Sequence, residues 1–178
     1  MRIIAGDYKG RRLYSPLDDD IRPTTDKVKE AIFSIIQEYI DEAICIDLFA
    51  GSGNLGLEAL SRGAKYCYFC DASRKSLELV KKNIQYCKAE NKSEIIAGDY
   101  TKTLCKINRK ADIIFLDPPY KNGLMQGCFE KIRENDVLSE DGIIIAEHGH
   151  YEELPDELFG YEKIKEKKYG SIVISIYS

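Results

Sequence analysis

The stretch DLFAGSGNLGLEAL, residues 47–60, places an acidic side chain and three glycines where a nucleotide-like ligand could bind. Gly51, Gly53 and Gly56 form the pattern G-x-G-x-x-G, and a glycine without a Cβ lets a ligand lie directly on the backbone of a strand-to-helix turn. Asp71 follows about twenty residues later, where a carboxylate can accept hydrogen bonds from ribose hydroxyls. A tight turn that binds nothing would use the same glycines, so this pattern alone is a weak signal.

Asp47 distinguishes between two classes of ligand for this turn. A carboxylate beside the turn would repel the pyrophosphate of NAD, whereas it suits a cationic group. S-adenosylmethionine offers an ammonium group to Asp47, a ribose to Asp71, and a carboxylate to the turn amides and the following helix N-terminus. We therefore predict S-adenosylmethionine as the cofactor in place of NAD, and no metal.

A second candidate site ends the stretch ADIIFLDPPY, residues 111–120. Pro118 and Pro119 lack a backbone N–H and could simply terminate a strand. That interpretation leaves unexplained the acid before them, Asp117, and the aromatic residue after them, Tyr120. The carboxyl ends of parallel strands meet at one edge of a sheet, so these four residues are predicted to lie beside the glycine turn.

The elements that must position these residues alternate between strand-like and helix-like stretches from residue 43 to residue 148. That alternation predicts an α/β domain with a mostly parallel sheet and helices on both faces. The stretches 161–170 and 171–178 follow each other without a helix, which predicts an antiparallel pair that completes the sheet. Upstream, residues 2–15 predict a β-hairpin, and the stretch 22–40 predicts a helix that follows Thr25 as its N-cap.

Composition limits the classes of protein to which the chain can belong. Its 178 residues suffice for one globular domain, which we expect to span 1–178, with a hairpin arm over 1–20 and a catalytic core over 21–178. The apolar runs are too short to cross a bilayer and the N-terminus lacks the features of a signal peptide, so we expect a cytoplasmic protein. The CYFC stretch, residues 67–70, reads as a strand whose cysteines point to opposite faces and pack in the core.

Several segments resemble, in order along nearly the whole chain, the RsmD family: MRIIAGDYKGRRL, RPTTDKVKEAIF, DLFAGSGNLGLEALSRGA, IIFLDPPY and the terminal YG strand. The DPPY tetrapeptide is similar to the D/N-P-P-Y/F motif of amino-directed S-adenosylmethionine methyltransferases. The resemblance implies a Rossmann-like class I methyltransferase with a mostly parallel seven-stranded sheet and an antiparallel last strand. It also implies methylation of the N2 amine of a guanine in bacterial small-subunit (16S) ribosomal RNA, either naked or within an assembled or partly assembled 30S particle, by a monomer without a membrane partner.

The resemblance further implies roles for individual residues. The Asp117 carboxylate and the Pro118 carbonyl would accept hydrogen bonds from the two hydrogens of the target amine, with the Pro118–Pro119 backbone holding their direction. Tyr120 would stack on the base. Asp99 matches the family position that binds the adenine amine, with Tyr100 beside it, although Asp99 could equally cap the next helix.

Two more groups of residues are assigned through the resemblance. Arg22 and Thr24 open a segment that borders the methionine end of the cofactor in related enzymes, and local capping is their alternative role. The chain has a net charge of −4, so a nucleic-acid partner must bind a local basic patch. The family uses the N-terminal arm for RNA contact, and the candidate residues there, for which a solvated surface is the alternative, are Arg2, Lys9, Arg11 and Arg12.

Three rival functions stay open at this point. One is a methyltransferase for another amine, in DNA adenine, another RNA base or a protein glutamine. Glutamine-directed enzymes favour Asn where this chain has Asp117, and DNA enzymes usually carry a sizeable recognition insertion. The others are an NAD-linked oxidoreductase, for which the sequence offers no second domain, and a catalytically dead binding module, against which the complete DPPY motif argues.

Overall fold

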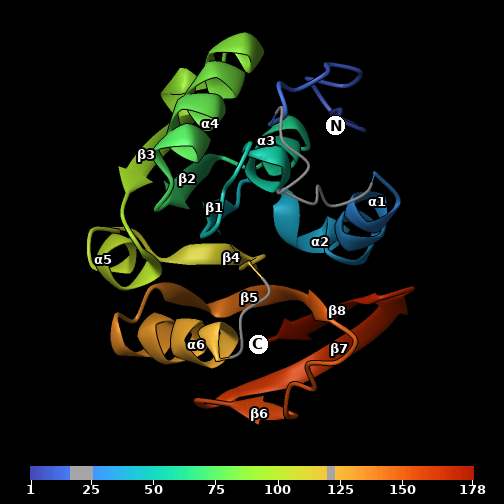
Figure 1. Cartoon of the computed structure of the whole chain (residues 1–178), viewed down its shortest axis with the longest axis vertical. Coiled ribbons are helices and arrows are strands. Elements are labelled where there is room, and N and C mark those ends of the chain that lie inside the picture. The colour runs from blue at the N-terminus through green and yellow to red at the C-terminus, as the bar shows by residue number, and fades with distance from the viewer. Residues whose placement is uncertain (17–25, 120–122) are drawn as a thin grey trace.

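The computed structural model of the chain describes residues 1–16, 26–119 and 123–178, and Figure 1 shows their arrangement. Helices and strands alternate as the sequence predicts. The helical elements are α1 (Asp26–Ile35), α2 (Gln37–Ile40), α3 (Asn54–Ser61), α4 (Arg74–Cys87), η1 (Glu90–Lys92), α5 (Tyr100–Leu104) and α6 (Leu124–Glu134). The strands are β1 (Ile44–Asp47), β2 (Tyr66–Asp71), β3 (Ser93–Ala97), β4 (Ala111–Leu116), β5 (Leu138–Gly149), β6 (Glu157–Leu158), β7 (Tyr161–Tyr169) and β8 (Ile172–Tyr177).

The strands form one sheet in the order β3-β2-β1-β4-β5-β8-β7-β6. The five strands β3, β2, β1, β4 and β5 are parallel, whereas β8 pairs antiparallel with both β5 and β7. This arrangement confirms the mostly parallel α/β sheet with an antiparallel end. The sheet of the described residues has eight strands, one more than the seven expected. The additional strand is the two-residue β6, which pairs with β7 at the edge of the sheet. The sequence DEL at 156–158 is too short to show a strand pattern.

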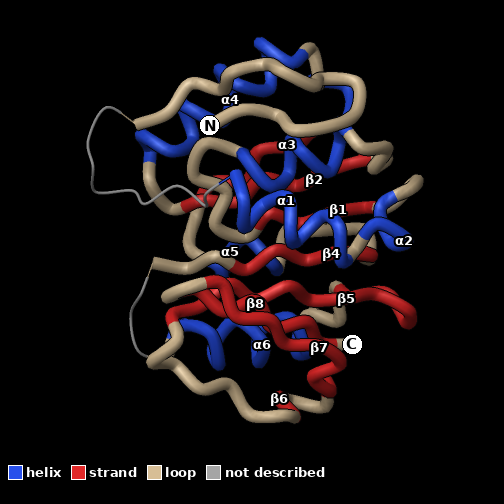
Figure 2. The backbone as a smooth tube through the Cα atoms, turned by 90° about the vertical axis from the view of Figure 1, so that its right-hand side faces the viewer, coloured by secondary structure: helices blue, strands red, loops and turns tan. Residues whose placement is uncertain are grey.

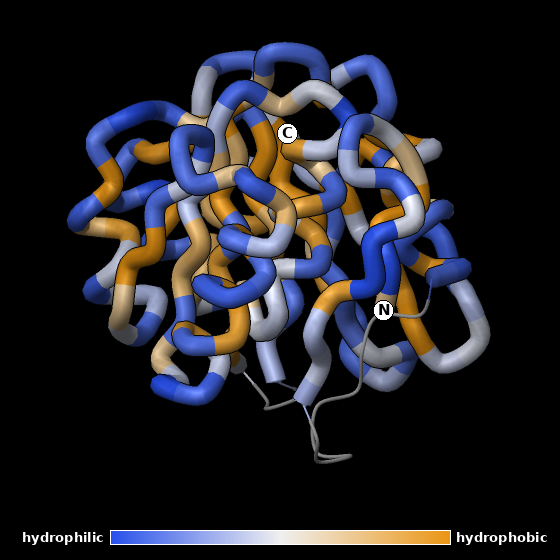
Figure 3. The backbone as a smooth tube through the Cα atoms, turned by 90° about the horizontal axis from the view of Figure 1, so that it is seen from above, coloured by the Kyte–Doolittle hydropathy of each residue, from blue (hydrophilic) through white to orange (hydrophobic). Residues whose placement is uncertain are grey.

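Successive strand residues face opposite sides of the sheet and belong to two separate hydrophobic cores. One core contains Cys45, Cys67 and Phe69 together with residues of α1, α3 and α4, and the other contains Ile46 and Cys70 together with residues of α5 and α6. Cys67 and Cys70 therefore lie on opposite faces of β2, as predicted. Figure 3 shows the apolar chain concentrated inside and the polar chain around it.

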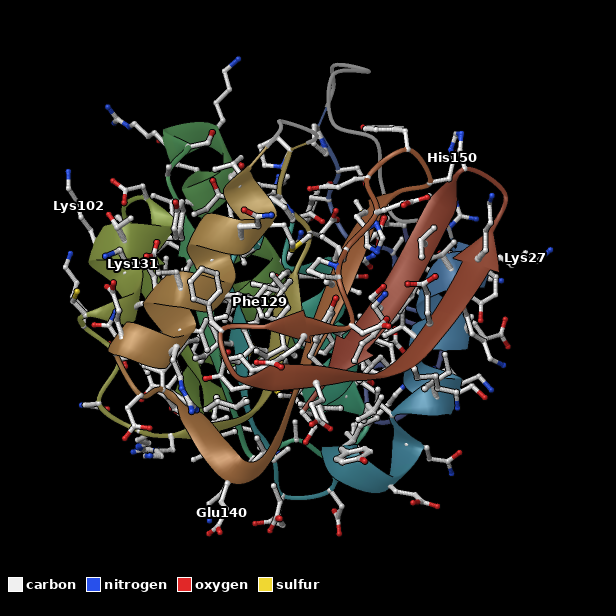
Figure 4. The ribbon with its side chains drawn as sticks, turned by 90° about the horizontal axis from the view of Figure 1, so that it is seen from below. Lys27, Lys102, Phe129, Lys131, Glu140 and His150 are labelled. Carbon is white, nitrogen blue, oxygen red and sulfur yellow. The ribbon has the colours of Figure 1, made fainter. Side chains whose placement is uncertain are left out.

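The helix predicted over residues 22–40 is interrupted. It begins at Asp26 within the described residues and breaks at Ile36, where a bend separates α1 from α2. The predicted cap Thr25 lies outside the described residues. On the other side of the sheet, Phe129 of α6, which is labelled in Figure 4, packs edge-to-face on Tyr177 with ring centroids 4.8 Å apart.

The N-terminal segment, residues 1–14, folds back on itself through a single antiparallel bridge between Arg2 and Arg12. It is thus a looser hairpin than predicted, without regular strands. Ile3 and Leu13 are buried in the same core as α1 and α3, and Figure 2 shows the N-terminus beside the helices of that face. The arm is packed against the core. Among the described residues, no helix is long and apolar enough to span a membrane.

Candidate active site

The carboxyl ends of β1, β2, β3 and β4 and the loops that follow them surround a cavity of about 570 Å³. That volume lies within the range of sites for small molecules. Most of the residues predicted to form the site line this one cavity: Asp47, Gly51, Asp71, Asp99, Tyr100, Asp117, Pro118 and Pro119. Parallel strand order explains the convergence, because strands distant in sequence end at the same edge of the sheet.

The three glycines of the first turn have different roles. Gly51 lines the cavity with a φ of +55°, and a Cβ placed on it would meet only open space, so the backbone there is exposed to a ligand. Gly53, also predicted to bind the cofactor, is not among the lining residues. Its φ is +81° and a Cβ would approach the Val80 side chain to 2.7 Å, so it makes the turn and lets α4 pack closely. Gly56 similarly lets α3 approach Phe69 of β2.

Asp47 is buried at the floor of the cavity and accepts a hydrogen bond of 3.0 Å from the Gly56 amide. Burial raises the pKa of its carboxyl to about 7, the Gly56 amide opposes the shift, and the nearby Asp117 and Asp71 add to it. Near neutral pH this carboxyl therefore exchanges between neutral and charged forms. A cationic ligand group in the cavity would favour the charged form.

Asp71 orders the backbone on two sides of the cavity. Its Oδ2 accepts from the Gly51 amide at 2.9 Å, and its Oδ1 accepts from the Ser73 amide at 2.8 Å, just before α4. Each carboxylate oxygen can accept a second hydrogen bond. Asp71 can therefore support the glycine turn and still accept from ligand hydroxyls.

Asp99 caps α5, the alternative role that the sequence left open. Its Oδ1 accepts from the backbone amides of Thr101 and Lys102 at 3.0 and 3.2 Å and from the Thr101 hydroxyl. The Thr101 hydroxyl, with those amides, lowers the pKa of the Asp99 carboxyl. Asp99 also lines the cavity, so capping and ligand contact are compatible. Tyr100 beside it packs against Phe49, with ring centroids 6.3 Å apart.

Asp117 and Pro118 follow β4 directly and reach the cavity between the glycine turn and α6. Pro118 is buried and Asp117 is half-buried. The remaining predicted residues of this region, Tyr120, Arg22 and Thr24, lie outside the described residues.

Several lining residues were not predicted from the sequence, among them Met1, Phe49 and Asn54. Met1 Sδ lies 3.5 Å from the Ser52 hydroxyl, so the start of the N-terminal segment forms part of the cavity wall. Phe49 and Asn54 belong to the glycine-rich stretch, and their position in that stretch could have predicted that they line the cavity. Met1 carried no comparable signal.

A buried ion pair connects the N-terminal segment to this wall. Lys29 and Glu58, both with fully buried side chains, lie 3.1 Å apart. Lys29 Nζ also donates to the Arg2 carbonyl at 2.5 Å and to Asn54 Oδ1 at 2.7 Å. Glu58 in turn accepts from the backbone amides of residues 4 and 5. The N-terminus is therefore held beside the cavity by charged hydrogen bonds in the interior.

The predicted RNA-binding residues lie on the surface of the N-terminal segment, and two have partners within the protein. Arg2 pairs with Asp26 at 3.2 Å. The Arg11 guanidinium donates to the Tyr86 carbonyl at 3.1 Å. Lys9 and Arg12 are exposed. Among the described residues, no group of three or more His, Cys, Asp and Glu side chains could hold a metal ion.

Comparison with known proteins places this geometry in context. The family described as "Conserved hypothetical protein 95" matches residues 1–178. The chain is 40% identical to the Bacillus subtilis (strain 168) protein named "Putative rRNA methyltransferase YlbH", over 99% of this chain and 98% of that protein. It is 33% identical to Ribosomal RNA small subunit methyltransferase D of Escherichia coli (strain K12), over 99% of this chain and 89% of that protein. The solved structure of the "Putative methyltransferase yhhF from Escherichia coli" matches with a TM-score of 0.89 and 31% identity, covering 99% of this chain and 96% of that one.

Proposed function

The chain belongs to the RsmD family of ribosomal RNA methyltransferases, and on this basis we propose that it transfers a methyl group from S-adenosylmethionine to the N2 amine of a guanine in small-subunit ribosomal RNA. The observation that carries the proposal is the convergence of Asp47, Asp71, Asp117 and Pro118 on one cavity. The carboxylates of Asp47, Asp71 and Asp117 suit the cofactor or the target amine by charge. Pro118 offers a backbone carbonyl in a fixed direction.

The cavity fits S-adenosylmethionine better than a phosphate-bearing cofactor. The open backbone at Gly51 gives a flat surface for a ligand, and Asp71 lies beside it to accept from the ribose hydroxyls. Asp47 stands at the floor for the ammonium group. Burial raises the pKa of Asp47, and the nearby carboxylates of Asp117 and Asp71 add to this shift. The negative charge of these carboxylates would also repel a pyrophosphate.

When bound, S-adenosylmethionine supplies an electrophilic methyl group. The task of the protein is to present the guanine amine, whose lone pair is delocalised into the ring and is a poor nucleophile. The Asp117 carboxylate and the Pro118 carbonyl each accept a hydrogen bond from the amine, which favours a pyramidal nitrogen with its lone pair toward the methyl group. Because Pro118 and Pro119 restrict the backbone, these two acceptors keep their direction as the base enters.

The RNA is proposed to approach along the N-terminal segment, where Arg2, Lys9 and Arg12 are exposed and Arg11 lies beside them. The rRNA is the partner whether naked or within a 30S particle, and the enzyme acts as a monomer in the cytoplasm.

The proposal is tested by methyl transfer in vitro. Purified protein with radiolabelled S-adenosylmethionine should methylate small-subunit ribosomal RNA, as a transcript or as a 30S particle, and nuclease digestion should release N2-methylguanosine. Asp117→Ala should lower kcat by about 10²-fold while the dissociation constant of S-adenosylhomocysteine stays the same. Asp141→Ala is the matched control, because Asp141 is exposed in β5 and no residue of β5 lines the cavity. Label on adenine, on protein, or in no product would reject the assignment.

A further inference from the structure

We propose, resting on the proposed RNA substrate, that one side of α4 and the N-terminal segment form a continuous binding surface for single-stranded ribosomal RNA. Lys75, Lys82 and Tyr86 of α4 are the new contact residues. We call this the α4 surface. It extends the RNA contact beyond the four residues of the N-terminal segment that the family resemblance suggests.

Charge distribution is the first support. Residues 1–14 contain four Lys or Arg residues against one acid, and α4 also contains four against one. The whole chain has a net charge of −4, so these two adjacent segments are strongly positive in a protein that is otherwise acidic. A local basic region on an acidic protein is typical of a nucleic-acid contact.

The two segments are joined by specific contacts along their length. The buried Asn83 of α4 donates to the Tyr14 carbonyl at 2.9 Å and accepts from the Tyr14 amide at 2.8 Å. At the end of α4, the Arg11 guanidinium donates to the Tyr86 carbonyl. Figures 1 and 2 both show the N-terminal segment beside this helix. These contacts hold the two segments together before RNA binds, which reduces the entropy lost on binding.

Aromatic rings lie among the cations of this surface. Tyr14 and Tyr86 are 42% and 45% exposed, and their rings pack edge-to-face with centroids 5.7 Å apart. Lys82 Nζ lies 3.7 Å from the centroid of the Tyr14 ring, which positions its ammonium group before any ligand arrives. Tyr86 offers an exposed ring on which a base can stack, with Lys82 next to it for a phosphate.

The spacing on α4 matches an extended strand. Lys75, Lys82 and Tyr86 are separated by seven and four residues, so they lie on one side of the helix and span about 16 Å along its axis. The α4 surface also leads to the active site, because Ser73 and Ser76 at the start of α4 line the cavity. An RNA strand held along it would enter the site from the α4 end.

Binding of the small-subunit ribosomal RNA transcript, measured between about 50 and 200 mM salt, tests the surface. Lys75→Gln with Lys82→Gln should reduce the slope of log K against log salt by about 1.4, the value for two phosphate contacts of a single strand. It should raise KM for the RNA while kcat and S-adenosylhomocysteine affinity stay unchanged. Tyr86→Ala should weaken RNA binding roughly fivefold or more, and Tyr86→Phe should restore it, because stacking needs the ring and not the hydroxyl.

The matched control is Lys81→Gln with Lys88→Gln. It removes the same charge from exposed residues of the same region, but Lys81 lies about 100° round the helix from Lys82, on the side away from Asn83. Equal salt slopes for the two double variants would overturn the α4 surface while wild-type methylation still supported the proposed function. A wild-type protein that neither binds nor methylates the transcript or the 30S particle would instead overturn the proposed function, and the α4 surface with it.

Discussion

Replacing Lys29 with methionine should lower the free energy of unfolding by about 3 kcal/mol, the lower end of the range for removal of one partner from a buried ion pair. The ammonium group of Lys29 has three hydrogen-bonding partners: the Arg2 carbonyl, Asn54 Oδ1 and Glu58 Oε2. All three of its N–H groups are thus used. Methionine keeps the apolar stem but leaves the three acceptors without this donor.

The lower end of the range applies because Glu58 keeps other hydrogen-bond donors when Lys29 is replaced. Arg62 donates to Glu58 Oε1 at 2.8 Å, and the amides of Ile4 and Ala5 donate to the same carboxylate at 2.9 and 3.1 Å. Burial lowers the pKa of Lys29, and the neighbouring Glu58 opposes this shift. The cost of removing the Lys29 ammonium group from water therefore reduces the net stabilisation that its charge provides.

Thermal unfolding gives a direct measurement. For a chain of this size, about 3 kcal/mol corresponds to a fall in Tm of roughly 6 to 12 °C. Lys27→Met is the matched control, since Lys27 is an exposed residue of the same helix whose side chain points outward in Figure 4. It should melt close to the wild type. A Tm for Lys29→Met within about 2 °C of the wild type would refute the reasoning, because it would mean that desolvation of the ammonium group cancels its contacts.

Three further predictions concern the cavity and its support. Asp71→Ala should weaken S-adenosylhomocysteine binding, measured by calorimetry, by about 1 to 3 kcal/mol, because ribose hydroxyls lose their acceptor; unchanged binding would place the ribose elsewhere. Burial raises the pKa of the Asp47 carboxyl to about 7, so the folded protein binds this proton more tightly than the unfolded chain does. The stabilisation that this proton provides is complete below the unfolded pKa of 3.8 and is lost as the pH rises through about 7. For the same reason cofactor affinity should increase between about pH 6 and 8, and Asp47→Asn should remove both pH dependences. Gly56→Ala should lower the free energy of unfolding in urea by about 1 to 3 kcal/mol, since its Cβ would lie 2.4 Å from Phe69; a neutral effect would show that α3 can shift.

Local patterns were sufficient to predict much of the fold and the acidic residues that line the cavity. The alternation of strand and helix runs predicted the parallel sheet, and the position of Asp47, Asp71 and Asp117 at strand ends predicted that they converge. Parallel topology makes this inference possible, because it converts a sequence position at a strand end into a place at one edge of the sheet. The strand reading of CYFC was confirmed in the same way, by a period of two.

The sequence by itself determined the order of the elements, the direction of the sheet and the edge at which the acids meet, because these depend on short-range periodicity and turn residues. Only the tertiary structure decided that Gly53 packs against α4 instead of lining the cavity, that Met1 reaches the cavity wall, and that Asp99 caps α5. It also decided that Lys29 and Glu58 are buried partners across 29 residues of chain. Such facts depend on which distant side chains share a space, and no local pattern encodes the distance between them.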